Sequence, residues 1–130
     1  TGTDKRLYNH ELGFDDGSTV PASAITAYVR SSPIDLGDGE QFVFMRRMIP
    51  DVSFRDSDAE TPTLDVTTRV RNYSGGNYLR TTTSTIQPDT ELVHLRLRGR
   101  QFSLLVQSDG LEVGWRLGTM RYDLRPDGRR

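Results

Sequence analysis

The sequence contains no cysteine, only one tryptophan and only two histidines among its 130 residues. Without cysteine the chain cannot form a disulfide framework, a thiolate metal site or a cysteine nucleophile. This composition fits a protein that assembles in a cytoplasm, where disulfides are rare.

Long hydrophobic runs and a large net charge are also absent. No apolar run approaches the roughly 20 residues needed to cross a bilayer, and no signal peptide is recognisable. Seventeen basic residues are balanced by eighteen acidic ones, which gives a formal net charge of -1. A dedicated nucleic-acid-binding domain is usually clearly basic. The composition therefore predicts neither a membrane nor a specific nucleic-acid partner.

The length predicts one domain that is large enough to bury a core. Residues 1–6 are polar, and we expect them to be a flexible N-terminal linker. We expect residues 7–130 to form a single domain. Because residue 1 is Thr rather than Met, we expect the chain to be the C-terminal part of a longer protein.

The last third of the chain shows the clearest secondary-structure pattern. Apolar and polar residues alternate over residues 92–98, 102–108 and 120–125, as in strands with one buried face. Gly99 and the pair Asp109–Gly110 separate these runs and suit tight turns. The pattern predicts a meander of three or four antiparallel strands with Trp115 near its centre.

Strand patterns also occur earlier, over residues 25–30, 41–50, 63–71 and 78–86, and no amphipathic helix is recognisable. Seven or eight strands at this spacing predict an all-β, antiparallel β-sandwich of the jelly-roll or immunoglobulin-like type. A barrel is the alternative. The expected core comprises Phe42, Phe44, Leu64, Val66, Phe102, Leu104, Val106 and Trp115.

Catalytic motifs are weak in this sequence. The pair His10–Glu11 lacks the second histidine that a zincin motif requires four residues after the first, where Phe14 stands instead. There is no Gly-x-Ser-x-Gly nucleophile elbow. The residues therefore predict a binding or structural module without cofactor or metal, and not an enzyme.

One acidic loop is a weak candidate for calcium. Asp35, Asp38 and Glu40 alternate with glycines, and carboxylates in a glycine-rich loop can hold calcium. Their spacing differs from that of an EF-hand. The alternative is a loop whose side chains bond to nearby backbone amides.

Arginine is concentrated in the last third of the chain. Its planar guanidinium suits paired and partly buried contacts, so these arginines predict either a solvated face or a surface that docks on another protein. Arg98, Arg100 and Gln101 are interpreted as an intersubunit or intersheet polar network, or as a bonded hairpin turn. The candidate assembly residues are Arg96, Arg98, Arg100, Arg116, Arg121 and Arg125.

Three groups of motifs resemble a β-rich domain of virion structural proteins from tailed bacteriophages, especially short-tailed ones. Their order and spacing carry the resemblance, which spans almost the whole chain except residues 72–86. The first is Tyr-Asn-His-Glu-Leu-Gly at 8–13, followed by 25–30. The second is Asp-Leu-Gly-Asp-Gly-Glu-Gln-Phe at 35–42, which runs into 46–51. The third combines Arg-Gly-Arg-Gln at 98–101 with Ser108, Trp-Arg-Leu-Gly at 115–118 and residues 121–130.

The resemblance implies a structural, non-catalytic role in the tail, in a nozzle or stabilising ring below the portal. It implies other tail and virion proteins as partners, a homo-oligomeric ring, and a virion location after assembly in the host cytoplasm. Ring contacts join two different patches. Acidic loops at 35–40 or 51–60 are expected to complement the arginines.

Two alternatives remain open at this point. The first is a carbohydrate-binding module on a phage fibre or a secreted enzyme, which needs exposed aromatic rings. The second is a glycosidase fragment, which needs two carboxylates facing each other across about 5–10 Å. In both cases the protein would bind a glycan. The aromatic candidates for sugar stacking are Tyr8, Tyr28, Tyr73, Tyr78 and Trp115.

Overall fold

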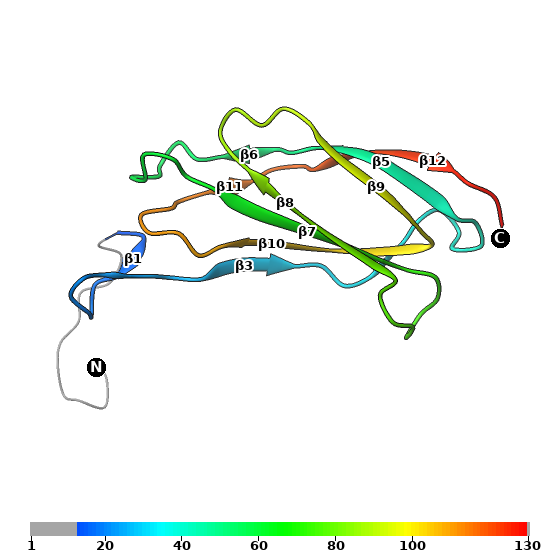
Figure 1. Cartoon of the computed structure of the whole chain (residues 1–130), viewed down its shortest axis with the longest axis horizontal. Coiled ribbons are helices and arrows are strands. Elements are labelled where there is room, and N and C mark those ends of the chain that lie inside the picture. The colour runs from blue at the N-terminus through cyan, green and yellow to red at the C-terminus, as the bar shows by residue number, and fades with distance from the viewer. Residues whose placement is uncertain (1–12, 130) are drawn as a thin grey trace.

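The structure is a computed structural model that describes residues 13–129, which form strands and loops but no helix (Figure 1). Seven strands have four or more residues, and five have two. The strands are β1 (Asp15–Asp16), β2 (Ser23–Ala24), β3 (Ala27–Arg30), β4 (Ile34–Asp35), β5 (Val43–Ile49), β6 (Val52–Ser53), β7 (Leu64–Arg71), β8 (Arg80–Ile86), β9 (Val93–Gly99), β10 (Gln101–Ser108), β11 (Arg116–Leu117) and β12 (Arg121–Pro126).

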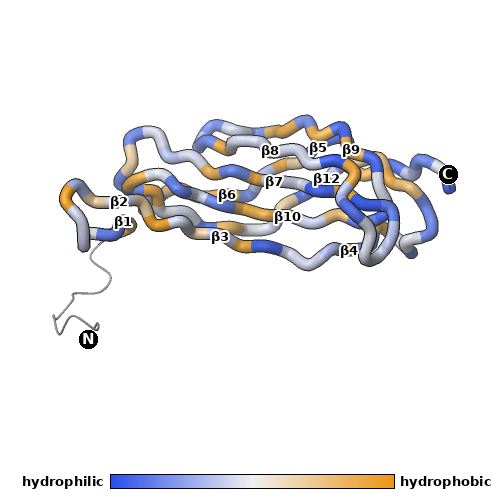
Figure 2. Tube along the Cα trace, turned by 60° about the horizontal axis from the view of Figure 1, so that its bottom comes forward, coloured by the Kyte–Doolittle hydropathy of each residue, from blue (hydrophilic) through white to orange (hydrophobic). Residues whose placement is uncertain are grey.

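Two larger sheets form the body of the fold. One has the order β3-β10-β7-β8, with β4 also paired to β10, and the other has the order β12-β5-β9. The ribbons β1-β2 and β11-β6 complete the sheet structure of the described chain, and every pairing is antiparallel. The prediction of an all-β, sandwich-like fold is confirmed. In Figures 1 and 2, β1 and the C-terminal segment lie at opposite ends.

The core lies between the two larger sheets. Leu64, Val66 and Val70 of β7 are buried while the residues between them are more exposed, except Thr68. This is the alternation that the sequence predicts, and it is visible as alternating colours along the strands in Figure 2. The buried hydrophobic cluster comprises Leu36, Val43, Met45, Met48, Leu64, Val66, Val70, Ile86, Val93, Leu95, Leu97, Phe102 and Val106.

The predicted core needs one correction, at Phe44. Val43 and Met45 on either side of it are buried, so Phe44 points to the opposite face of β5. It lies between Arg98 of β9 and Arg125 of β12 in the register. The sequence of residues 41–50 does not show which side chains face the core, because both faces of β5 carry large apolar side chains.

The other predicted core residues divide into two groups. Phe42, Leu64, Val66, Phe102 and Val106 are buried. Leu104 and Trp115 are partly buried and pack against the core cluster. Trp115 is not central, because it follows the long loop after β10.

The predicted C-terminal meander is wrong. β9 and β12 both pair with β5, whereas β10 pairs with β3, β4 and β7 in the other sheet. The chain crosses between sheets at Gly99, where an added Cβ would lie 2.8 Å from Cβ of Val70. At this crossing the Arg100 amide donates to the Arg71 carbonyl oxygen over 3.1 Å. Alternation identifies strands, but it does not identify their partners.

Candidate functional site

The outer face of the β12-β5-β9 sheet carries most of the candidate assembly arginines. Directly opposed residues of antiparallel strands share one face. Arg125, Phe44 and Arg98 are aligned across the three strands, so their side chains share the outer face. Asp123, Arg47 and His94 form the next aligned row, and Arg121 lies opposite Ile49 further along β12.

Two more arginines join this face at an irregularity between β5 and β9. The register shifts between Met45 and Arg47, so that Arg46 faces the two residues Leu95 and Arg96. Arg96 has a φ of 52°, in the left-handed region that glycine usually occupies at a bulge. The side chains of Arg46 and Arg96 are both exposed.

These residues define a surface that we call the arginine face. Asp123 accepts a hydrogen bond from Nε of Arg47 over 2.9 Å, and Asp127 pairs with Arg98. Within residues 13–129 the other four arginines are exposed and form no salt bridge or side-chain hydrogen bond. Their charges are therefore available to a partner. The arginine face comprises Arg46, Arg47, Arg96, Arg98, Arg121 and Arg125.

Two predicted interface arginines act inside the domain. The guanidinium carbons of Arg98 and Arg100 lie 4.0 and 4.7 Å from the centroid of the Phe42 ring. Nη2 of Arg98 donates to the Asp127 carbonyl oxygen over 3.1 Å, and Nη2 of Arg100 donates to that of Arg129 over 2.9 Å. The backbone amide of Asp127 donates to the Phe42 carbonyl oxygen over 2.8 Å. These contacts hold the C-terminal segment against β5.

Gln101 belongs to a different polar group from Arg98 and Arg100. Its Nε2 donates to Oδ1 of Asp35 over 2.5 Å, and its Oε1 accepts from Nε of Arg71 over 2.7 Å. The three residues lie opposite one another on β4, β10 and β7. The predicted network of three residues is therefore split between the two sheets, because the chain changes sheet immediately before Gln101.

Arg116 lies away from the arginine face. It belongs to β11, which pairs only with β6 among the described strands, and its Nη2 lies 2.6 Å from Oδ2 of Asp56. Both side chains are well exposed, at 79% and 51%, so this ion pair contributes little to stability.

The structure does not gather the calcium candidates into a metal site. Oδ1 of Asp35 accepts the hydrogen bond from Gln101, and within residues 13–129 no three histidine or acidic side chains are grouped so as to hold a metal ion. Asp38 and Glu40 are exposed. The pair His10–Glu11 and Tyr8 lie outside the described residues.

Acidic residues from three separate segments meet at the β1 end of the sandwich. Oδ1 of Asp15 accepts a hydrogen bond from the Glu112 amide over 2.7 Å. The Glu112 carbonyl oxygen accepts from the amides of Asp58 and Ala59 over 3.1 and 3.0 Å. We call this surface the acidic end, and sequence reasoning missed most of it because its members are far apart in the chain. It comprises Asp15, Asp16, Asp56, Asp58, Glu60, Asp109 and Glu112.

One carboxylate of the acidic end has a shifted pKa. Hydrogen bonds from the side chain and backbone amide of Ser18 lower the pKa of Asp16 below its ordinary value, and the amide bond measures 2.9 Å. Asp16 therefore stays ionised at mildly acidic pH.

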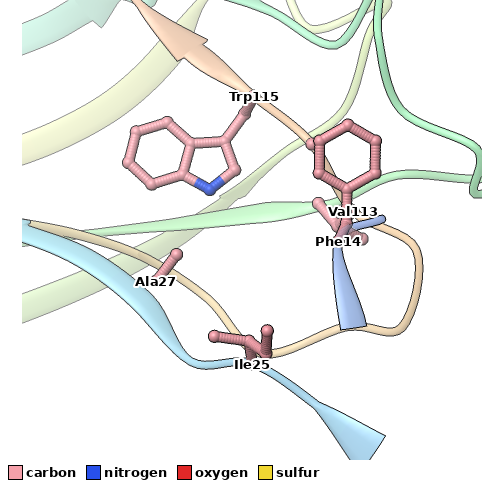
Figure 3. A pocket seen from close by; sticks show the side chains of 6 residues that line it. Phe14, Ile25, Ala27, Val113 and Trp115 are labelled. Carbon is pink, nitrogen blue, oxygen red and sulfur yellow. The ribbon is translucent and has the colours of Figure 1, made fainter. Parts of the chain in front are cut away.

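A small open pocket lies beside the acidic end (Figure 3). It has a volume of about 260 Å³. Its wall includes the ring of Trp115, whose Nε1 donates to Oγ of Ser108 over 2.8 Å. A Cβ on Gly114 would lie 2.6 Å from the Phe14 ring, so a side chain at this position would displace the ring. Among residues 13–129 no charged side chain lines the pocket, and the lining comprises Phe14, Ile25, Ala27, Val113, Gly114 and Trp115.

No protein-family model matches the chain, and no curated protein matches it significantly. Within residues 13–129 no helix has the length and apolar character needed to span a membrane.

Proposed function

We propose that this chain is a structural, non-catalytic domain of a tailed-bacteriophage virion, associated with the tail and acting through protein–protein contacts. The observation that carries this proposal is the arginine face. Four arginines without a partner among the described residues project from strands of one sheet, and two acidic side chains, Asp123 and Asp127, pair with the neighbouring Arg47 and Arg98. Such a surface suits recognition of an acidic protein surface.

The motifs behind the phage resemblance occupy structural positions, which supports the proposal. Gly99 is the point where the chain changes sheet, and its neighbours Arg98 and Arg100 hold the C-terminal segment. Gly118 donates its amide to the Asp51 carbonyl oxygen over 2.8 Å, and a Cβ there would collide with the Asp51 carboxylate. Gly99 and Gly118 of these motifs maintain the scaffold, whereas Ile25, Ala27 and Trp115 of the same motifs line the pocket.

The virion assignment is tested on particles of the phage that encodes the chain. Tryptic peptides from density-purified particles are identified by mass spectrometry, and antibodies against the chain locate it by immunogold electron microscopy. We expect peptides of this chain in the particles and gold at the tail. If the peptides are found only in the unassembled fraction of the lysate, the proposal is wrong.

The pocket favours glycan binding as a second candidate function, because Phe14 and Trp115 present aromatic rings in its wall. A glycan array probed with the purified chain separates the two functions. Saturable binding to one glycan class that Phe14→Ala abolishes would favour the carbohydrate-binding alternative. The structural proposal expects no such binding.

A further inference from the structure

Positive and negative side chains of the described residues gather on different surfaces, although the whole chain is nearly neutral, with a net charge of -1. Six arginines lie on the outer face of the β12-β5-β9 sheet, where Asp123 pairs with Arg47 and Asp127 pairs with Arg98. Seven carboxylates belong to three segments, 15–16, 56–60 and 109–112, that hydrogen bonds join at the β1 end, where Arg116 pairs with Asp56. One molecule therefore carries two surfaces of opposite charge that do not face each other.

We propose that the arginine face of one copy binds the acidic end of a second copy, so that copies associate head to tail. This inference rests on the proposed assembly function and names its partner surface. Complementary charge is the main physical argument, because opposed potentials align two proteins and exclude wrong orientations.

Like-charge repulsion argues against the symmetrical alternative. A two-fold dimer places the same patch of both copies in contact. Arginine face against arginine face would bring the unpaired charges of Arg46, Arg96, Arg121 and Arg125 together, and acidic end against acidic end would do the same for carboxylates. A head-to-tail contact pairs opposite charges instead, and it generates either a closed ring or an open filament.

Both surfaces are held in place before they meet. Arg121 and Arg125 project from β12, and Asp123 between them fixes the guanidinium of Arg47. At the acidic end, the hydrogen bonds through Glu112 join the loop at Asp58 to the ribbon that contains Asp15. Because little ordering is needed on association, less of the interaction free energy is lost.

Nucleic acid is a poorer partner for the arginine face. Phosphate backbones attract proteins through summed positive charge, but this chain has a net charge of -1. Asp123 on the arginine face, and the seven carboxylates at the acidic end, would repel phosphates. A protein surface with discrete carboxylates is a better partner for the arginines of this face.

The test is a charge swap measured by light scattering and analytical ultracentrifugation on the full chain. The first variant carries Arg121→Glu and Arg125→Glu, which reverse the arginine face without touching the residues that clamp the C-terminal segment. The second carries Asp58→Lys and Glu60→Lys at the acidic end. The control carries Arg30→Glu and Arg80→Glu, two exposed positions in the other sheet.

We expect wild type and control to associate, and each swapped variant alone to associate at least about tenfold more weakly because like charges meet. An equimolar mixture of the two swapped variants should regain association, because the new glutamates meet the new lysines. Circular dichroism spectra check that all variants are folded.

Three outcomes overturn the inference. The first is a wild type that remains monomeric at every accessible concentration. The second is association of the swapped variants as strong as that of the control. The third is a mixture of the swapped variants that does not regain association. A fluorescent 20-base-pair DNA duplex serves as a further probe, and a monomer that binds it through Arg121 and Arg125 would replace the protein partner with nucleic acid. A monomeric wild type that is still found in purified particles would contradict only the head-to-tail contact.

Discussion

Arg98 stacks on Phe42, with its guanidinium carbon 4.0 Å from the ring centroid. Arg100 stacks on the same ring at 4.7 Å. Through Asp127 and Arg129 the two arginines also bind the C-terminal segment. Arginine thus has two separate roles in this sheet, because these stacked side chains stabilise the fold while the unpaired ones on the arginine face are free for recognition.

Removing the guanidinium of Arg98 should loosen the C-terminal segment. We expect Arg98→Met to lower the free energy of unfolding by about 1 kcal/mol, since a partly exposed cation–π contact and its hydrogen bonds are lost. The midpoint of urea denaturation measures this loss. The matched control Arg121→Met removes an unpaired arginine and should leave the midpoint unchanged. Equal midpoints for the two variants would show that Arg98 does not stabilise the fold by holding the C-terminal segment.

The buried hydroxyl of Thr68 should lower the stability of the fold. Its side chain is fully buried between Val66 and Val70 on the inner face of β7, and its Oγ1 has no hydrogen-bond partner. Thr68→Val keeps the shape and removes the unpaired hydroxyl, so we expect stability to rise by about 1–2 kcal/mol. Thermal unfolding measures the change. Thr83→Val is the control, because it breaks the 2.9 Å bond with Thr67 and should not stabilise.

Tyr122 should make the fold sensitive to alkali. Burial raises the pKa of its hydroxyl above the ordinary value, and the hydroxyl has no hydrogen-bond partner. A group whose folded pKa is raised gives stability that is complete below the unfolded pKa of about 10 and is lost as pH rises above it. We therefore expect the free energy of unfolding to fall above about pH 10, by at most about 1.4 kcal/mol per pH unit for this group.

The control for this pH dependence is Tyr122→Phe, which keeps the ring contact with Phe102, whose centroid lies 5.6 Å away. Denaturation midpoints from pH 8 upward should fall less steeply for the variant than for wild type. Parallel profiles would mean that Tyr122 titrates as an exposed tyrosine does.

Replacement of Arg96 by glycine should raise the stability of the fold. Its φ of 52° is in the left-handed region, which costs a residue with a side chain roughly 1–2 kcal/mol. We expect Arg96→Gly to raise the denaturation midpoint while it weakens self-association, because one charge leaves the arginine face. Arg46→Ala, which changes charge without that backbone effect, is the comparison. A lower midpoint for Arg96→Gly would show that the Arg96 side chain itself stabilises β9.

The sequence predicted the strands better than it predicted their partners. Alternation identified the inner face of β7 correctly, because Leu64, Val66 and Val70 recur with the period of a strand. It misassigned Phe44, because apolar residues occupy both faces of β5. It also missed the change of sheet at Gly99, since strand pairing depends on contacts between distant segments. The two-residue strands β1, β2, β4, β6 and β11 are too short to produce a pattern.

The candidate surfaces were predictable to different degrees. The arginines were visible in the sequence, but Arg98 and Arg100 could not be separated from Arg121 and Arg125 until Phe42 and Asp127 were placed beside them. The acidic end could not be predicted as a unit, because Asp15, Asp58 and Glu112 become neighbours only through long-range backbone hydrogen bonds.

The central claim about assembly is that copies of this domain bind one another through surfaces of opposite charge, and the solution mass of the wild-type chain tests it most directly. Light scattering over a range of concentrations should show the mass rising above the monomer value of 14.7 kDa. The mass should return toward that value when the salt concentration is raised to about 1 M, where charges are screened beyond about 3 Å. A mass of 14.7 kDa at every concentration and at low salt would contradict self-association through the arginine face.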